Sequence, residues 1–276
     1  MSDHLSDNLS DQQIEHVTEI LREAAATAVL PRFRALAAGE VTEKSPGELV
    51  TVADREAEAL ITARLRALLD VPVVGEEAGT ADPGLLAALR EAPVAWLVDP
   101  LDGTANFVAG RPHFAVMAAL VRAGRTVACW ILQPATGRSY TAQLGAGAFR
   151  DGTRIRRAPA PAALGELRGA ALTRFLDPAE RAAVAAAADR FAALGSGTGS
   201  AGVDYPDLVE GGLDFIRYQR TLPWDHAPGA LLLAEAGGTA RRLDGTAYQV
   251  TDTRTGLLVA ADSACWSAVR TALTGG

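Results

Sequence analysis

The feature that most constrains this chain is an apolar run, residues 95–98, that leads into two carboxylates three residues apart, Asp99 and Asp102. The run predicts a buried strand, and acids at the end of a buried strand cost free energy unless they have partners. Pro100 stiffens the turn between them. The segment therefore predicts a rigid turn at which both carboxylates converge on one or two cations, with the Leu101 carbonyl pointing into the same space.

A helix beginning near Thr104 is expected to complete this turn. Gly103 lets the backbone approach a ligand closely. The free N–H groups and positive dipole end of a helix suit a phosphate. Cations on one side and a helix N-terminus on the other would clamp a phosphoryl group. The alternative is that Asp99 and Asp102 only cap a turn and a helix.

Two further segments have the same construction. An apolar stretch before Gly75 leads into Glu76 and Glu77, and Pro223-Trp224 precedes Asp225 and His226 at the start of a predicted helix. Taken singly, Glu77 is expected in a solvated loop, Asp225 could be a helix N-cap, and His226 is expected to point away from its neighbour. Together the three segments predict one acidic site.

Composition excludes several other classes of protein. The chain has 276 residues, 49% of them hydrophobic and 21% charged, which fits one large α/β unit or two subdomains. Its formal net charge of -7 disfavours general nucleic-acid binding and an RNA-associated role. Cys129 and Cys265, both in Ala-Cys-Trp contexts, are expected to be buried, reduced thiols. With no leader-like segment or membrane-length apolar run, we expect a cytoplasmic protein with no membrane partner.

The apolar periodicity predicts a mixed α/β layout, with strands grouped in the first half and regular alternation in the second. The expected helices are 11–38 (ended or kinked by Pro31), 54–69, 177–194, 202–208, 225–236 and 263–273. The expected strands are 71–74, 95–98, 114–121, 126–132, 139–143, 168–172, 213–218 and 257–261. Residues 39–48 are expected to be a loop. A Pro- and Arg-rich stretch, 151–167, suggests a boundary between an α+β metal-binding subdomain, 1–150, and an α/β substrate subdomain, 151–276.

The order and spelling of these segments resemble the inositol monophosphatase family of magnesium-dependent, lithium-sensitive phosphatases. The resemblance rests on Asp-Pro-Leu-Asp-Gly-Thr-Ala-Asn-Phe at 99–107, Trp-Asp-His-Ala at 224–227, Gly-Glu-Glu at 75–77, and a lysine-to-aspartate segment at 44–54. It implies a layered α/β/α/β/α sandwich with the site between its halves. It also implies a homodimer.

The resemblance further implies which residues hold the metals. Glu76, Asp99 and the Leu101 carbonyl would hold one Mg²⁺, and Asp99, Asp102 and Asp225 a second. A third ion, bound more weakly, would be coordinated by Glu76 and water, giving two to three ions per site. Oxygen ligands with several retained waters are what Mg²⁺ requires.

By the same resemblance, Thr104, with Asp54 behind it, would orient and deprotonate the attacking water. Glu76, next to the third ion, would also be a catalytic residue. The backbone N–H groups of Gly103 and Thr104 would bind the phosphate. The implied reaction is hydrolysis of a small phosphate monoester by metal-activated water, with no phosphoenzyme.

The sequence departs from the family pattern at residues that would meet the substrate. Inositol-type members carry an acid where this chain has Tyr218, and the family often has Asp where this chain has Glu48. Arg220 would share a face with Tyr218 in an extended chain, which suggests that it meets a second anionic group of the substrate. The alternative is a solvent-facing or ion-paired arginine.

Several substrates therefore stay open. An inositol-1-phosphate-like cyclitol or a sugar monophosphate ranks first, followed by fructose 1,6-bisphosphate, a nucleotide 3'-phosphate and histidinol phosphate. A non-catalytic protein that binds metal and phosphate is the alternative from another class. Every implied ligand is present together with Thr104, so the residues favour the enzyme.

Overall fold

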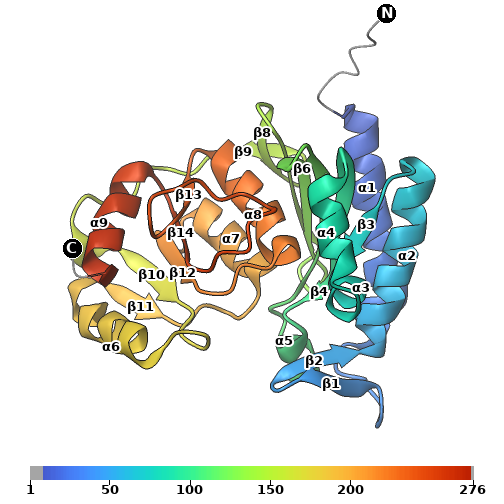
Figure 1. The fold of residues 1–276 in the computed structure, drawn as a ribbon, viewed down its shortest axis with the longest axis horizontal. Helices are drawn as coiled ribbons and strands as arrows, with labels where there is room; N and C mark the ends of the chain where they lie inside the picture. The colour runs from blue at the N-terminus through green and yellow to red at the C-terminus, as the bar shows by residue number, and fades with distance from the viewer. Residues whose placement is uncertain (1–8, 275–276) are drawn as a thin grey trace, which may run out of the picture.

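The computed structural model describes residues 9–274, which form five stacked layers (Figure 1). From right to left, Figure 1 shows helices α1 and α2, a first sheet, helices α7 and α8, a second sheet, and helices α6 and α9. This α/β/α/β/α order confirms the predicted mixed α/β fold class. None of the helices in the described residues is long and apolar enough to cross a membrane.

The first sheet has seven strands in the order β3-β4-β5-β6-β7-β8-β9. All neighbours are antiparallel except β3 and β4. The strands are β3 (Val73–Gly75), β4 (Val94–Asp102), β5 (Ala115–Arg122), β6 (Arg125–Gln133), β7 (Arg138–Gln143), β8 (Gly147–Arg150) and β9 (Thr153–Ile155). Five of these were predicted. The short β8 and β9 were missed because they carry too few apolar residues to show a period of two.

Helices α1 (Asp11–Ala24) and α2 (Val52–Leu68) pack against the first sheet. The predicted helix 11–38 is too long, since α1 gives way to a π-helical turn at residues 25–29 and a 3₁₀ turn at residues 30–32. The chain leaves helical geometry at Phe33, two residues after Pro31. Proline thus ends the helical segment, as its missing N–H and ring sterics require.

The predicted loop at 39–48 is wrong. The chain forms a hairpin there from β1 (Val41–Ser45) and β2 (Glu48–Thr51), with Gly47 at φ +74° in the turn. β1 has no buried residue, so it does not need the apolar alternation by which a strand is recognised in sequence. β2 is partly buried, but its four residues are too few to show a period. Figure 1 shows the hairpin below α2 and beside the short helix α5 (Thr104–Val108).

The second sheet has five strands in the order β11-β10-β12-β14-β13. Its strands are β10 (Arg168–Ala171), β11 (Ala193–Gly195), β12 (Phe215–Tyr218), β13 (Thr239–Arg242) and β14 (Leu257–Ala260). The helices α6 (Pro178–Ala187) and α9 (Ser263–Thr274) form the outermost layer. The predicted helix 177–194 is wrong at its end, because residues 193–195 pair with β10 as an edge strand. Tertiary pairing has overridden the helical propensity of an Ala-rich stretch.

Helices α7 (Ala201–Glu210) and α8 (Pro223–Ala236) lie between the two sheets. A side chain at Gly229 of α8 would come within 2.2 Å of the Tyr205 ring in α7, so the two helices pack closely. Because α8 is enclosed on both sides, its buried residues do not follow one face. This packing fixes the start of α8, and with it Asp225, against the first sheet. Cys129 and Cys265 are buried and unpaired, as predicted.

Candidate active site

Strand β4 carries Asp99 and Asp102, but it does not end at Asp99 as predicted. It continues to Asp102, and its pairing with β5 shifts register between the two acids. Gly103 then adopts φ +85°, and a Cβ there would lie 2.7 Å from the His113 carbonyl oxygen. Only glycine fits this backbone, which turns directly into α5. An irregularity of this kind redirects side chains next to a site.

Asp99 lies in an excess of negative charge. It is 1% exposed, its Oδ1 accepts a hydrogen bond from the Leu101 N–H at 3.1 Å, and its Oδ2 has no partner among the described residues. Burial raises the pKa of this carboxyl well above its usual range, and the nearby charges of Glu76 and Asp102 raise it further. A buried carboxylate oxygen without a donor, surrounded by other acids, is suited to a cation.

The neighbouring acids make more contacts. Asp102 accepts hydrogen bonds from the Ser200 hydroxyl at 2.5 Å and the Gly202 N–H at 2.6 Å. The Lys44 ammonium lies 2.7 Å from Glu76 and 2.8 Å from Glu77. Burial raises the pKa of Glu76 to about 7 even though Lys44 opposes the shift. Lys44 is the only lysine of the chain, and it holds the β1–β2 hairpin against the acids.

The prediction that Glu77 lies in a solvated loop is wrong, because Glu77 is in the first turn of α3 (Glu76–Ala81). It is half-buried and paired with Lys44, and its backbone N–H donates to Glu58 of α2 at 2.8 Å. A Cβ on Gly75 would lie 2.3 Å from the Glu58 carboxyl, so this acid packs closely under the turn that precedes α3. In the sequence Glu58 looks like any surface acid of an amphipathic helix, so no local signal identified it.

Thr104 and Asp54 are brought together as the sequence analysis expects. The Thr104 hydroxyl lies 2.9 Å from Asp54 Oδ1 and 3.0 Å from the Leu101 carbonyl oxygen. Asp54 also accepts from the N–H and hydroxyl of Thr51, and burial nevertheless raises its pKa to about 6. A hydroxyl has one hydrogen. When Thr104 donates it to Asp54, the Leu101 carbonyl is left free and the Thr104 oxygen can accept a hydrogen from a water.

Asp225, in the first turn of α8, belongs to the same electrostatic group. Its pKa is raised well above the usual range by burial and by the charges of Glu76 and Asp102, while Arg220 and Lys44 oppose the shift. Within residues 9–274, however, no three His, Cys, Asp or Glu side chains stand as a ready set of metal ligands. Protein donors hold Glu76 through Oε1 and Asp102 through Oδ2, so a metal would use their other oxygens or displace these donors. The ligand set therefore stays a prediction.

Tyr218 and Arg220 lie in the wall of a cavity of about 390 Å³ that also reaches Asp102 and Asp225. Tyr218 is 3% exposed, its ring stacks on Tyr205 with centroids 5.5 Å apart, and its hydroxyl has no partner among the described residues. Arg220 forms an ion pair with Glu48 of β2, which agrees with the ion-paired alternative for this arginine.

The His226 ring contacts groups other than the acids, although it lines the same cavity as Asp102 and Asp225. Its Nε2 lies 3.1 Å from the Arg220 carbonyl oxygen and its Nδ1 lies 3.2 Å from the Tyr205 hydroxyl. Because a carbonyl only accepts, Nε2 carries the hydrogen and Nδ1 accepts from tyrosine. Burial lowers the pKa of His226 to about 4, so the imidazole is neutral near pH 7. It supports the backbone between β12 and α8.

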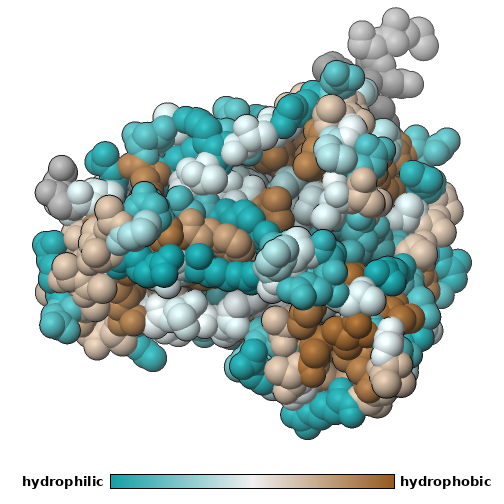
Figure 2. Space-filling view, turned by 60° about the horizontal axis from the view of Figure 1, so that its bottom comes forward, coloured by the Kyte–Doolittle hydropathy of each residue, from teal (hydrophilic) through white to brown (hydrophobic). Residues whose placement is uncertain are grey.

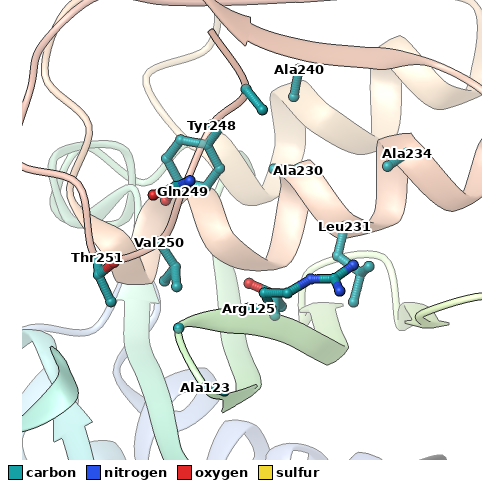
Figure 3. A pocket seen from close by; sticks show the side chains of 13 residues that line it. Ala123, Arg125, Ala230, Leu231, Ala234, Ala240, Tyr248, Gln249, Val250 and Thr251 are labelled. Carbon is teal, nitrogen blue, oxygen red and sulfur yellow. The ribbon is translucent and has the colours of Figure 1, made fainter. Parts of the chain in front are cut away.

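Another cavity, of about 490 Å³, lies between the β5–β6 turn, α8 and the segment before β14 (Figure 3). Figure 3 shows Arg125 and Leu231 on one side of it, and Tyr248 and Thr251 on another. No acid lines this cavity. It therefore offers no carboxylate ligand for a metal. The cavity next to Asp102 and Asp225 is the candidate active site, because two of the predicted metal-binding acids line it.

Comparisons with known proteins identify the family of this chain. The sequence model of the Inositol monophosphatase family matches residues 11–273. The chain is 35% identical over 210 residues to an inositol-1-monophosphatase of Rhizobium meliloti, which covers 75% of this chain and 76% of the relative. It is 33% identical over 209 residues to the Nus factor SuhB of Vibrio cholerae, covering 72% and 73%.

Solved structures show the same fold. An IMPase of Thermotoga maritima superposes with a TM-score of 0.81 at 25% identity, covering 96% of this chain and 97% of that one. The extragenic suppressor protein suhB of Bartonella henselae gives a TM-score of 0.79 at 25% identity, covering 94% and 99%. The likeness extends over both sheets.

Proposed function

This chain belongs to the inositol monophosphatase family and is a phosphoric monoester hydrolase, and we propose that it is a Mg²⁺-dependent phosphatase of a small phosphorylated metabolite. The observation that carries the proposal is the buried Oδ2 of Asp99, which has no hydrogen-bond partner in the described part of the chain and has Glu76, Asp102 and Asp225 as charged neighbours. The hydroxyl of Thr104, which contacts Asp54, also lies beside the carbonyl of Leu101 in β4, the strand that carries Asp99.

Metal dependence is general in this family. The residues present fit Mg²⁺, because Glu76, Asp99, Asp102, Asp225 and the Leu101 carbonyl all offer hard oxygen ligands. When bound, two to three Mg²⁺ ions would neutralise the phosphate and make a coordinated water more acidic. Their positions are part of the proposal.

The chain's own residues account for the handling of the proton. Thr104 accepts a hydrogen bond from the attacking water while donating its own hydrogen to Asp54. Asp54, whose pKa lies at about 6, is mostly ionised at neutral pH and can take the proton that the water loses. The amides of Gly103 and Thr104 precede the first full turn of α5 and have no helical acceptor, so they are free to face the phosphate.

The most direct test is phosphate release from a panel of small phosphate esters, with and without Mg²⁺, by the wild type and Asp99→Asn. We expect Mg²⁺-dependent release that the substitution abolishes. Asp189→Asn is the matched control, since Asp189 is an exposed acid outside the cavity. No release on any ester, from protein shown to be folded, would favour a non-catalytic metal- and phosphate-binding protein.

The panel should also rank the substrates. A cyclitol phosphate such as inositol 1-phosphate or a sugar monophosphate stands first, in keeping with the relatives named inositol-1-monophosphatase. Fructose 1,6-bisphosphate, a nucleotide 3'-phosphate and histidinol phosphate are the alternatives. Tyr218 and Arg220 are the residues proposed to contact the part of the substrate beyond the phosphate.

The relatives named Nus factor SuhB leave the prediction of no nucleic-acid partner open. The net charge of -7 still argues against a general affinity for RNA. A salt-titrated RNA-binding assay tests this, because electrostatic binding weakens steeply as salt rises. Tight binding that persists at physiological salt would contradict the prediction.

A cytoplasmic homodimer remains part of the proposal. Figure 2 shows hydrophobic residues gathered in a brown area at the lower right of the molecule. Leu30, in the turn after α1, is 40% exposed and is one of the large hydrophobic side chains at the surface of the described residues. Exposed apolar areas mark contact surfaces. Light scattering coupled to size exclusion would give twice the chain mass of 28.7 kDa, and a monomeric mass would contradict the dimer.

A further inference from the structure

The cavity beside Asp102 and Asp225 has a cationic wall. Arg174, Phe175 and Arg220 all line it. The Phe175 side chain is 44% exposed. The guanidinium carbons of Arg174 and Arg220 lie 5.0 Å and 4.6 Å from the centroid of the Phe175 ring. Contact with one ring keeps both guanidinium groups near each other and leaves their N–H edges available to an anion.

The charge of this wall is only half neutralised by the protein. Arg174 forms no ion pair with a carboxylate within residues 9–274, and its Nη2 donates to the Pro46 carbonyl at 3.1 Å. Arg220 has one carboxylate partner, Glu48, and that carboxylate also accepts from the Ser45 hydroxyl at 2.9 Å. The two arginines thus have one carboxylate partner between them, and both contact the β1–β2 hairpin, Arg220 through Glu48 and Arg174 through the Pro46 carbonyl.

Tyr218 points to the same substrate chemistry. It lines this cavity with a buried hydroxyl that has no partner among residues 9–274. A carboxylate there would accept from a pair of substrate hydroxyls and repel an anion, whereas a tyrosine hydroxyl can donate to an anion. The only acids among the cavity-lining residues are Asp102 and Asp225, both assigned to the metals. The other polar side chains of the wall include Thr173, Ser196 and Gln219, which offer a polyol neutral acceptors but no carboxylate.

We propose that Arg174 and Arg220, held on Phe175, form a subsite for an anionic group of the substrate other than the scissile phosphate. That group, a carboxylate or a second phosphate, displaces Glu48 from Arg220 and accepts from both guanidinium groups, with the Tyr218 hydroxyl as a further donor. Glu48 occupies the subsite when no such substrate is bound. This inference rests on the proposed phosphatase function and narrows its substrate class.

Two matched pairs of esters test the subsite with the Mg²⁺-loaded enzyme. 3-Phosphoglycerate and glycerol 3-phosphate differ by a carboxylate, and fructose 1,6-bisphosphate and fructose 1-phosphate differ by a second phosphate. The readout is the ratio of kcat/KM within each pair, which cancels general effects on turnover. A ratio above about ten for the first pair identifies a carboxylate, and for the second pair a phosphate, since a charge-assisted hydrogen bond is worth roughly that factor.

Arg220→Gln and Arg174→Gln should each lower the favoured ratio by about tenfold, mainly through KM, and Arg220→Lys should lower it less. Glu48→Gln should raise the ratio, because it removes the competing carboxylate. Arg154→Gln is the matched control, since Arg154 also lies over a phenylalanine ring, at 6.0 Å from Phe149, outside this cavity. Its ratio should equal that of the wild type.

Ratios near one for both pairs in the wild type, or ratios that neither arginine substitution lowers, would overturn the subsite. If Arg220→Gln fails to fold, Arg174→Gln and Glu48→Gln decide, and a lowered ratio in Glu48→Gln would also overturn the subsite. p-Nitrophenyl phosphate, which has no second anion, tests the phosphatase function separately. If even this ester is not hydrolysed, calorimetric binding of 3-phosphoglycerate against glycerol 3-phosphate, in wild type and Arg174→Gln, still tests the subsite.

Discussion

The two charged walls of the candidate site are built in opposite ways. Asp99 and Asp102 are buried, Glu76 and Asp225 are half-buried, and these acids repel one another. Within residues 9–274, Asp99 Oδ2 has no hydrogen-bond donor. The side chain of Arg220 is 39% exposed and already paired with Glu48, and Arg174 is exposed beside it. Burying an unpaired charge costs several kcal/mol, while a half-exposed ion pair is worth about 0–1 kcal/mol. The first wall is therefore stabilised by protonation or by an external cation, and the second can change partners at little cost.

Asp99→Asn should give the largest effect, because it removes the acid on which the first wall depends. We expect phosphate release to fall by about 10³-fold or more, since metal stabilisation supplies several kcal/mol. Without divalent ions, the same variant should be more stable than the wild type at pH 7. The folded-state pKa of Asp99 is raised, so its ionisation destabilises the fold as pH rises above the unfolded pKa, and asparagine cannot ionise.

Phosphate release and thermal unfolding in EDTA measure these two effects. An unchanged or lower unfolding temperature for Asp99→Asn would mean that its carboxylate is stabilised within the protein, which would remove the contrast between the walls. Asp189→Asn should change neither quantity.

His226→Gln should show the next largest effect, because His226 joins the two walls through the backbone of Arg220. The folded-state pKa of His226 is about 4 against an ordinary 6.5, so the unfolded chain binds the extra proton first as pH falls. Stability from this group is present above pH 6.5 and is lost between pH 6.5 and 4, by about 3 kcal/mol.

Urea denaturation at pH 7 and pH 4.5 measures this loss as the difference between wild type and His226→Gln. The comparison is needed because the buried acids, with raised pKa values, shift stability in the opposite direction. His16→Gln is the control, since His16 is exposed on α1. Parallel pH profiles for wild type and His226→Gln would contradict the assignment of a neutral, buried imidazole.

Thr104→Val should lower kcat by about 10², the usual contribution of a positioned proton acceptor, with little change in KM. The substitution keeps the shape of the side chain and removes the hydroxyl that contacts Asp54. Thr104→Ser restores the hydroxyl and should recover most of the rate. Equal losses in the valine and serine variants would show that the hydroxyl does not handle the proton.

Substitution of Lys44 should give the smallest effect, and the effect should be limited to the contact with Glu76. Lys44 competes with a cation for Glu76, so Lys44→Met should tighten Mg²⁺ binding, by tenfold at most, in calorimetry at pH 8.5. The alkaline pH keeps Glu76 ionised once Lys44 is gone, because its pKa lies at about 7 even with Lys44 present. Weaker Mg²⁺ binding in the variant would mean that Lys44 supports the site instead.

Because Lys44 is the only lysine, reductive ¹³C-methylation labels it together with the N-terminal amine. In NMR spectra, the dimethyl-lysine signal should move as Mg²⁺ is added and Lys44 leaves Glu76. A signal that stays fixed while Mg²⁺ binds would show that Glu76 is not a ligand.

The two walls also differ in how well the sequence predicted them. The acids at β3, β4 and α8 were all identified, because each follows or opens an element with a clear apolar pattern. Arg174 and Phe175 were not singled out, since an exposed loop after a short strand carries no period. The hairpin of β1 and β2 was predicted as a loop for the same reason, and it brings Glu48 and Lys44 to the site.

By itself, the sequence determined that an acidic site would form at the ends of apolar segments, because strand and helix boundaries depend on local composition. Only the tertiary structure decided what each charged group contacts. Ser200 meets Asp102 from 98 residues away, and Glu48 meets Arg220 from 172 residues away. Such pairs depend on how two sheets and the helices between them stack. No periodicity within a single segment encodes that arrangement, because it is fixed by the packing of the whole core.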